Sequence, residues 1–295
     1  MQIFSISYTL TVARLIMAYP AAISRLPQGS GEVARYIRGR IKTDYKRNAT
    51  AIAKHEHLRF LLRNDDSGYG ACLMQRGLYE PEVLRISRHI LKEGDVVVDA
   101  GANIGWHTIH FAKYVGESGM VFAFEPELSN FEYLSKSVSL NNLRNVALRL
   151  QCLSNLNGKV LLYRAKPGES GSDSIVRRKS EATVMVDSTS LDHFWRQNEL
   201  DRVHLLKIDV EAAEPLVIDG GLEHLDKVSH IIMEWNREVW QDRYELLGRL
   251  ARQFEIYEVR IGFPFLIKRI ENPVKSLPLI APTSGMVYMR NRAGD

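Results

Sequence analysis

The sequence predicts an α/β protein built on a mostly parallel sheet, and three observations support this fold class. Residues 96–98 form an uninterrupted valine run capped by Asp99, as is typical of a strand buried on both faces. The run leads through a glycine-bearing turn into residues 106–114, whose apolar positions predict a helix. Further apolar runs, each followed by polar residues, occupy residues 120–124, 146–152, 203–208, 228–233 and 255–259. Helices predicted at residues 79–91 and 237–252 complete the alternation of strands and helices that α/β folds show.

The turn after the first strand is the strongest sign of a ligand. Gly101 and Gly105 allow a tight turn and a close ligand approach, and the following helix aims free N–H groups at it. The dinucleotide fingerprint G-x-G-x-x-G fails, because its later glycines would fall on Asn103 and Trp106. A P-loop fails as well, since no Gly-Lys-Ser or Gly-Lys-Thr follows at the required spacing. The turn therefore predicts a bound nucleoside of another class.

Polar side chains follow the later strands, where parallel strands present their carboxyl ends to a ligand. Glu125 follows residues 120–124, near the ~20-residue spacing at which an acid accepts ribose hydroxyls. Ser154, or Asn155 beside it, follows residues 146–152 and is expected to meet an adenine edge. The remaining candidates are Asp209 and Glu211 after residues 203–208, and Glu234 and Asn236 after residues 228–233.

Several segments of the chain form one set. They are Gly77-x-Tyr79-Glu80-Pro81-Glu82, the run from residue 96 to residue 105, Phe124-Glu125-Pro126, Lys207-Ile208-Asp209-Val210-Glu211 with Glu214, and Ile231-Ile232-Met233-Glu234. This set resembles the FkbM family of methyltransferases over roughly residues 77–240. One departure is visible, because Ala212 stands where the family usually has glycine. We expect a small effect of this alanine unless the backbone there needs a positive φ.

The resemblance implies a Rossmann-like sheet of seven strands, mostly parallel, in which residues 285–290 form an antiparallel last strand. It implies that S-adenosylmethionine is the methyl donor, because the glycine turn resembles motif I of the class I methyltransferases. The residues expected to bind this cofactor are Asp99, Gly101, Asn103, Gly105, Glu125 and Ser154. The implied activity is that of an O-methyltransferase acting on a hydroxyl of a sugar, a glycan or glycolipid, or a natural product. A small-molecule or glycan acceptor is thus the expected partner.

The chemistry of methyl transfer points to the acids at the later strand ends. A hydroxyl is a poor nucleophile until it is deprotonated or bound to a metal. Asp209 and Glu211 are the candidate catalytic residues, either as the base or as groups that bind the acceptor hydroxyls. A divalent cation such as Mg²⁺, held by Asp209, Glu234 and Asn236, is the alternative, because it prefers such oxygen ligands.

Other residues that can carry chemistry are expected to be structural. Lys207 is expected to pack its stem and hold its charged head in solvent. The cysteines at positions 72 and 152 form neither a disulfide framework nor a metal cluster. Three histidines close to the motifs are expected to be packed or surface residues: His107, His110 and His204.

Two other classes of function stay open. A nucleic-acid methyltransferase is favoured by a basic N-terminal region. It is disfavoured because no Asn-Pro-Pro-Tyr-like motif follows the fourth strand, and because Asp209 and Glu211 would repel phosphate. Nucleic acid is therefore not the expected partner. A non-catalytic interaction protein with the same fold is the other alternative, since fold alone does not carry function.

The chain is expected to divide into two parts. Residues 1–74 form an accessory region, helical to about residue 54 and with a short strand at residues 57–62. Residues 75–295 form the methyltransferase domain, with a β-rich insertion at about residues 157–187. Residues 3–23 are apolar but contain Arg14 and Pro20, which disfavours a membrane span. They predict an amphipathic helix that packs on the core, swaps with a partner in a homo-oligomer, or lies on a membrane surface.

Composition agrees with a globular protein of the cytoplasm. The chain has 45% hydrophobic and 25% charged residues, and a net charge of +4. Positive charge is concentrated in residues 25–63, which hold ten Lys and Arg residues against three acids. This stretch is expected to be a solvated surface, or else a patch for an anionic lipid, nucleic acid or acidic glycan. Peripheral contact with the inner face of the membrane is the second expectation for this region.

Overall fold

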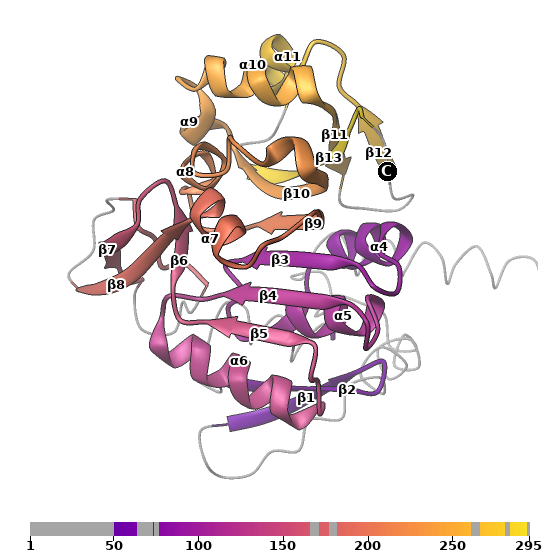
Figure 1. The fold of residues 1–295 in the computed structure, drawn as a ribbon, viewed down its shortest axis with the longest axis vertical. Helices are drawn as coiled ribbons and strands as arrows, with labels where there is room; N and C mark the ends of the chain where they lie inside the picture. Colours follow the sequence, from indigo (N-terminus) through magenta and orange to yellow (C-terminus); the bar gives the residue numbers. More distant parts are fainter. Residues whose placement is uncertain are drawn as a thin grey trace, which may run out of the picture.

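The computed structural model describes residues 50–63, 73, 77–165, 171–176, 182–260, 266–280 and 284–293. Within them, an eight-stranded sheet forms the centre of the protein (Figure 1). From one edge to the other its strands are β12 (Leu266–Arg269), β11 (Phe254–Arg260), β13 (Ser284–Asn291), β10 (Val228–Asn236), β9 (Val203–Ile208), β3 (Val96–Ala100), β4 (Met120–Phe124) and β5 (Val146–Arg149).

The directions of these strands confirm the predicted fold class. β10, β9, β3, β4 and β5 run parallel to one another. β13, the last strand of the chain, lies antiparallel between β10 and β11. β12 was not predicted and adds an eighth strand at the edge, antiparallel to β11. Only the first two of its four residues, Leu266 and Ile267, are apolar, and Lys268 and Arg269 follow them.

The predicted third strand, residues 146–152, is in fact two strands in different sheets. β5 ends at Arg149, and after the exposed Leu150 the chain enters β6 (Cys152–Ser154). β6 pairs in parallel with β8 (Thr183–Ser190), which pairs antiparallel with β7 (Gly158–Tyr163). Hydropathy does not reveal this break, because the partner of β6 lies far along the chain. The resulting three-stranded sheet stands beside the carboxyl end of β4 (Figure 1).

Helices cover both faces of the large sheet, because neighbouring side chains of a strand point to opposite faces. Val98 of β3 packs in the core cluster shared with α7 (Leu191–Gln197), α8 (Glu214–Asp219), α10 (Tyr244–Gln253) and α11 (Pro273–Ile280). Val97 packs on the other face with α4 (Pro81–Ile90) and α5 (Trp106–Tyr114). Both valines are fully buried, and each contributes on the order of 2 kcal/mol to folding.

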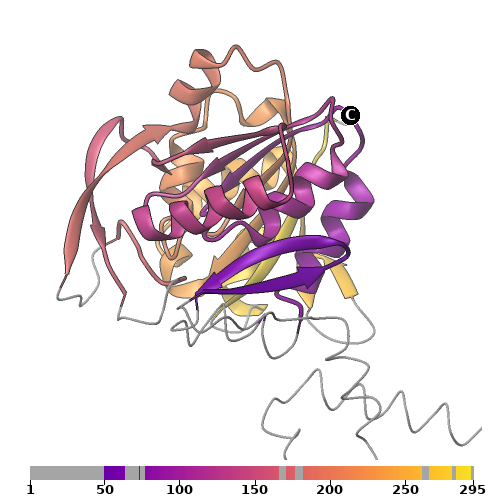
Figure 2. The ribbon, with the colours of Figure 1, turned by 90° about the horizontal axis from the view of Figure 1, so that it is seen from below.

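A hairpin precedes the sheet and corrects one prediction. Residues 50–54, expected to be helical, belong to β1 (Thr50–His55), which pairs with β2 (Leu58–Arg63), close to the strand predicted at residues 57–62. The hairpin lies against α5 and α6 (Leu128–Leu140), where Phe60 and Leu62 are buried (Figure 2). This burial of alternate residues favours strand over helix. The amphipathic helix predicted at residues 3–23, and the basic residues before position 50, lie outside the described residues.

The helix predicted at residues 237–252 is interrupted. It consists of α9 (Arg237–Trp240) and α10, which begins at Tyr244. Trp240 is buried and stacks on Trp235, with ring centroids 5.2 Å apart, so packing of this ring anchors the chain where α9 ends. Within the described residues, no helix combines the length and the apolar character needed to cross a membrane.

Candidate active site

A cavity of about 330 Å³ lies at the carboxyl ends of β3, β4 and β9, within the range of small-molecule sites. Five predicted site residues line it: Gly101, Asn103, Glu125, Asp209 and Glu211. The described lining leaves out the other five: Asp99, Gly105, Ser154, Glu234 and Asn236. The structure thus brings together the ends of three neighbouring strands, as the sequence predicts.

The two glycines of the turn adopt backbone conformations that other residues rarely adopt. Gly101 has φ 79° and Gly105 has φ 97°, in the left-handed region that favours glycine. A Cβ on Gly105 would lie 2.7 Å from Cδ1 of Leu134 in α6. Gly105 therefore lets α5 start close to α6, and Gly101 carries the chain from β3 onto the cavity wall.

Glu125 and Asn103 form one polar wall of the cavity. The Glu125 carboxylate accepts hydrogen bonds from the backbone N–H groups of Asn103, at 2.8 Å, and Glu127, at 2.9 Å. Burial raises the pKa of Glu125 to about 7, against the opposing effect of these two N–H donors. Oδ1 of Asn103 is buried and has no hydrogen-bond partner among the described residues. An unsatisfied acceptor beside a carboxylate fits S-adenosylmethionine, which offers an amino group and ribose hydroxyls.

A buried lysine, Lys207 of β9, connects β9 to its neighbour β3. Lys207 is 2% exposed, and its Nζ lies 3.2 Å from Oδ2 of Asp209 and 3.6 Å from Oδ1 of Asp99. It also donates a hydrogen bond to the carbonyl oxygen of Gly101. Burial disfavours the charged lysine, but Asp209, Asp99 and Glu80 outweigh burial and raise its pKa above the usual value. The expectation that the head of Lys207 reaches solvent is therefore wrong.

Asp99 lies outside the described cavity lining. It is fully buried and accepts a 2.6 Å hydrogen bond from the hydroxyl of Thr108 in α5. Burial raises its pKa, while Lys207 and Thr108 oppose this shift. In this position Asp99 ties β3 to α5 and to Lys207, whereas the sequence led us to expect it among the groups around the cofactor.

Ser154 and Asn236 have hydrogen-bond partners elsewhere, while the charge of the site acts on Glu234. The Ser154 hydroxyl bonds to Ser188 at 2.7 Å and accepts from the N–H of Leu156, while Cys152 and Leu153 form the cavity wall instead. The side chain of Asn236 caps α9 by accepting from the N–H of Glu238. Burial, with Asp209 as the next cause, raises the pKa of Glu234 to about 8.

The structure adds residues that the sequence analysis did not select. Tyr79 and His107 line the cavity, and Nε2 of His107 lies 3.5 Å from Oε2 of Glu80. The signal for Tyr79 was the Gly77-x-Tyr79-Glu80 segment, which contributed to the family resemblance without a role, whereas His107 was expected to be only a packed or surface residue. His110 is packed as expected, with Nδ1 2.7 Å from the carbonyl oxygen of Trp106.

Comparison with known proteins agrees with this geometry. The model of the methyltransferase FkbM domain matches residues 99–259, more than half of the chain. The chain belongs to the FkbM methyltransferase family. The match begins at Asp99 in β3 and ends in β11, so the FkbM domain contains the glycine turn, Glu125, Lys207 and Asp209.

Three curated relatives of this FkbM protein are methyltransferases. The hexuronic acid methyltransferase AglP of Haloferax volcanii is 27% identical over 194 residues, 65% of this chain and 78% of that protein. Methyltransferase 1 of Beauveria bassiana is 30% identical over 47% of this chain and 63% of its own length, just under two thirds. Methyltransferase sdnD of Sordaria araneosa is 27% identical over 49% of this chain and 67% of its own length.

The alanine that departs from the FkbM pattern lies in a strained loop. Ala212 has φ 76° and Glu211 has φ 56°. Oε1 of Glu214 holds this loop by accepting from the N–H groups of Val210 and Ala212, and burial raises the pKa of Glu214 to about 7. The backbone thus has the positive φ on which our expectation of a small effect depended, so alanine costs stability here.

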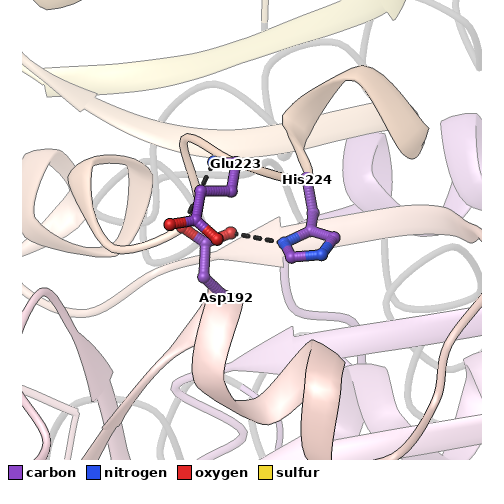
Figure 3. Close-up of side chains that lie close together, drawn as sticks. All are labelled: Asp192, Glu223 and His224. Atoms are coloured by element: carbon purple, nitrogen blue, oxygen red, sulfur yellow. Dashed lines mark hydrogen bonds and ion pairs between the residues drawn. The ribbon is translucent and has the colours of Figure 1, made fainter.

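A second cluster of titratable groups in the FkbM protein lies outside the described cavity lining (Figure 3). Nδ1 of His224 lies 2.8 Å from Oδ1 of Asp192, whose other oxygen accepts from the backbone N–H of Glu223. The Glu223 carboxylate pairs with Arg196. These contacts fasten α7 to the loop before β10, which is a structural role.

Proposed function

We propose that this methyltransferase transfers a methyl group from S-adenosylmethionine to a hydroxyl of a sugar, a glycan or glycolipid, or a natural product. The observation that carries the proposal is the position of Asp209. Its carboxylate lines the cavity beside the glycine turn, and Lys207 holds it at 3.2 Å. A carboxyl group held in one orientation at the methyl-transfer site suits an acceptor that carries hydroxyl groups.

We assign Glu125 and Asn103 to the part of the cavity that binds the methyl donor. S-adenosylmethionine supplies a methyl group on a sulfonium, which is activated for displacement. In its ionised form, Glu125 accepts the ribose hydroxyls, and the unpartnered Oδ1 of Asn103 accepts the amino group. Carboxylates on this wall also favour a cationic ligand by direct charge attraction.

We assign Asp209 and Glu211 to the part of the cavity that binds the acceptor. Nζ of Lys207 lies 3.2 Å from Oδ2 of Asp209 and fixes the orientation of this carboxyl group, which suits it to hydrogen bonding with an acceptor. We therefore assign Asp209 to hold an acceptor hydroxyl close to the methyl group, with Glu211 holding a neighbouring hydroxyl. The sugar class is supported by the relative described as a hexuronic acid methyltransferase.

A metal-assisted form of the reaction uses the same strand ends. In it, Asp209, Glu234 and Asn236 bind a divalent cation, although Asn236 Oδ1 must then give up its bond to the N–H of Glu238. We favour Lys207 as the positive charge that acts on Asp209, because it already lies within 3.2 Å. Treatment with EDTA followed by Mg²⁺ separates the two forms, since only the metal-assisted one loses and regains activity.

The deciding experiment supplies S-adenosylmethionine with an isotopically labelled methyl group and follows the label by mass spectrometry. The acceptors are a hexuronic acid, a neutral hexose, a cell extract and total RNA. Label in a hydroxyl-bearing compound, as a methyl ether, supports the proposal. Label in RNA supports the nucleic-acid alternative, and donor binding without transfer to any of them supports a non-catalytic role.

A further inference from the structure

The segment before α4 is held against the cavity in a strained conformation. Glu80 has φ 42°, in the left-handed region, although it is not glycine. The indole N–H of Trp106 donates a 2.9 Å hydrogen bond to the carbonyl oxygen of Tyr79, which fixes the segment to α5. Strain of this kind persists where the surrounding structure enforces it, and it accumulates at functional sites.

This segment pairs a carboxyl group with an imidazole. Oε2 of Glu80 and Nε2 of His107 lie 3.5 Å apart, and both atoms are buried without a hydrogen bond among the described residues. The His107 side chain is 5% exposed and lines the cavity. Because Nε2 faces Glu80, Nδ1 is the nitrogen left for a ligand.

Burial, reinforced by surrounding charges, keeps the imidazole neutral and gives the carboxyl group a high proton affinity. Burial lowers the pKa of His107 well below its usual value, and Lys207 and His110 add to the shift. Burial also raises the pKa of Glu80 well above its usual value. Asp209, Glu82 and Glu234 reinforce the shift of Glu80, and Lys207 opposes it.

We propose that His107 and Glu80 form a proton relay for the acceptor hydroxyl, an inference that rests on the proposed O-methyl transfer. The acceptor O–H bond breaks as Nδ1 of His107 takes the proton, and the Nε2 proton of His107 passes to Oε2 of Glu80. The acceptor oxygen bonds to the methyl carbon while the carbon–sulfur bond breaks, and its electron pair stays on sulfur. The relay starts with Glu80 as a carboxylate, the form present above its raised pKa. The imidazole ends neutral in its other tautomer, and Glu80 ends as a carboxylic acid.

The roles in this relay differ. His107 is a catalytic residue because it touches the reacting hydroxyl. Glu80 acts through His107 and is a positioning residue that also stores the proton. Asp209 still holds the reacting hydroxyl close to the methyl group and Glu211 a neighbouring hydroxyl, while the relay removes the proton of the reacting hydroxyl.

The test compares His107→Gln, Glu80→Gln and the double variant, using the hexuronic acid or neutral hexose that the wild type methylates. Each single variant is expected to lower kcat on the order of 100-fold, the range of general acid–base catalysis. The Kd for S-adenosylmethionine, measured by calorimetry, is expected to stay within about threefold, because the relay acts only in transfer. The double variant is expected to be no slower than His107→Gln, and Glu80→Asp to recover part of the rate.

Matched controls are His89→Gln and Glu132→Gln, at exposed positions of α4 and α6, which are expected to keep the wild-type kcat. Wild-type kcat in His107→Gln would overturn the relay. So would multiplied losses in the double variant, or a donor Kd that weakens as much as kcat falls. If the wild type methylates no hydroxyl compound, the proposed function itself fails.

A measurement on the wild type tests the relay without a variant or an acceptor. In the resting state the relay requires a proton on Nε2 of His107 and none on Nδ1. Nitrogen-15 NMR of labelled enzyme bound to S-adenosylmethionine reports this tautomer directly. A proton on Nδ1 in that state would refute the relay even if every variant failed to fold.

Discussion

A Cβ on Gly101 would lie 1.8 Å from the backbone carbonyl oxygen of Asp209. The turn after β3 and the end of β9 therefore meet backbone to backbone, and the N–H of Asp209 bonds to the carbonyl oxygen of Ala100 at 3.1 Å. In the proposed reaction, the first segment binds the donor and the second the acceptor. Their separation is set by main-chain contact, which rotamer changes do not alter.

Gly101→Ala is expected to destabilise the protein on the order of 3 kcal/mol, through steric overlap and a strained φ. Urea unfolding measures this loss. Gly285→Ala is the control, because a Cβ there meets nothing within 4 Å. Equal midpoints for both variants would contradict the close approach at Gly101.

Ala212→Gly is expected to stabilise the protein by about 1 kcal/mol, because glycine adopts the observed positive φ without strain. In thermal unfolding this corresponds to a rise in Tm of about 2–4 °C. Ala251→Gly in α10 should shift Tm in the opposite direction, since glycine weakens a helix by about 1 kcal/mol. A fall in Tm for Ala212→Gly would show that this loop is not strained.

Lys207→Met is expected to cost about 3–5 kcal/mol, because it leaves Asp99 and Asp209 without their buried cation. Equilibrium unfolding in urea gives the loss. Lys159→Met removes an exposed partner of Asp187 and is expected to leave the midpoint almost unchanged. If both lysine variants unfold alike, the buried pair contributes no more than a surface pair.

Affinity for S-adenosylmethionine is expected to increase as pH rises. The pKa of Glu125 is raised to about 7 in the folded, ligand-free protein, so the carboxylate that accepts ribose hydroxyls is scarce below that pH. Between about pH 6 and about pH 8 the Kd should fall roughly tenfold, as the ionised fraction grows. Calorimetry on Glu125→Gln should show a flat profile, and Glu132→Gln should keep the slope. A wild-type Kd that is independent of pH would refute this role of Glu125.

The same shift predicts the opposite trend for stability. A carboxyl group whose folded pKa lies above its unfolded value stabilises the fold below the unfolded pKa, and this contribution disappears as pH rises through the folded value. Glu125 and Glu214, both at about 7, and Glu234, at about 8, all contribute in this direction. Ligand-free protein should therefore lose stability across the pH range in which it gains donor affinity.

Asp209→Asn is expected to abolish methyl transfer while donor binding stays nearly unchanged. Asparagine keeps the shape of the side chain but removes the carboxyl group that Lys207 orients, and Asp99 still pairs with Lys207. Labelled-methyl transfer and calorimetry measure the two effects separately. Asp201→Asn, at an exposed site, is the control, and normal turnover by Asp209→Asn would remove Asp209 from the mechanism.

Local patterns predicted the centre of the fold well. The helix α5 has the predicted bounds and β3 contains the predicted valine run and Asp99, because a valine run, a glycine turn and helical spacing all act within a few residues. The strand ends that carry Glu125 and Asp209 follow from the same patterns.

Features set by distant partners were not predicted. β6 leaves the large sheet because its partner is β8, and α9 ends where Trp240 stacks on Trp235. Lys207 resembles any strand lysine until Asp99 and Asp209 meet around it. Ser154 has the expected position in the chain, but its hydroxyl serves the small sheet rather than the cavity.

The departure of β6 from the large sheet has a consequence for enzyme engineering. The small sheet shares a strand with the cavity wall, since Cys152 and Leu153 line the cavity while Cys152 pairs with Ser188 of β8. A chimaera that exchanges only the loops after β6 would join strands from different parents within one ladder. Exchange of the whole unit, residues 152–190, takes every strand of that ladder from one parent.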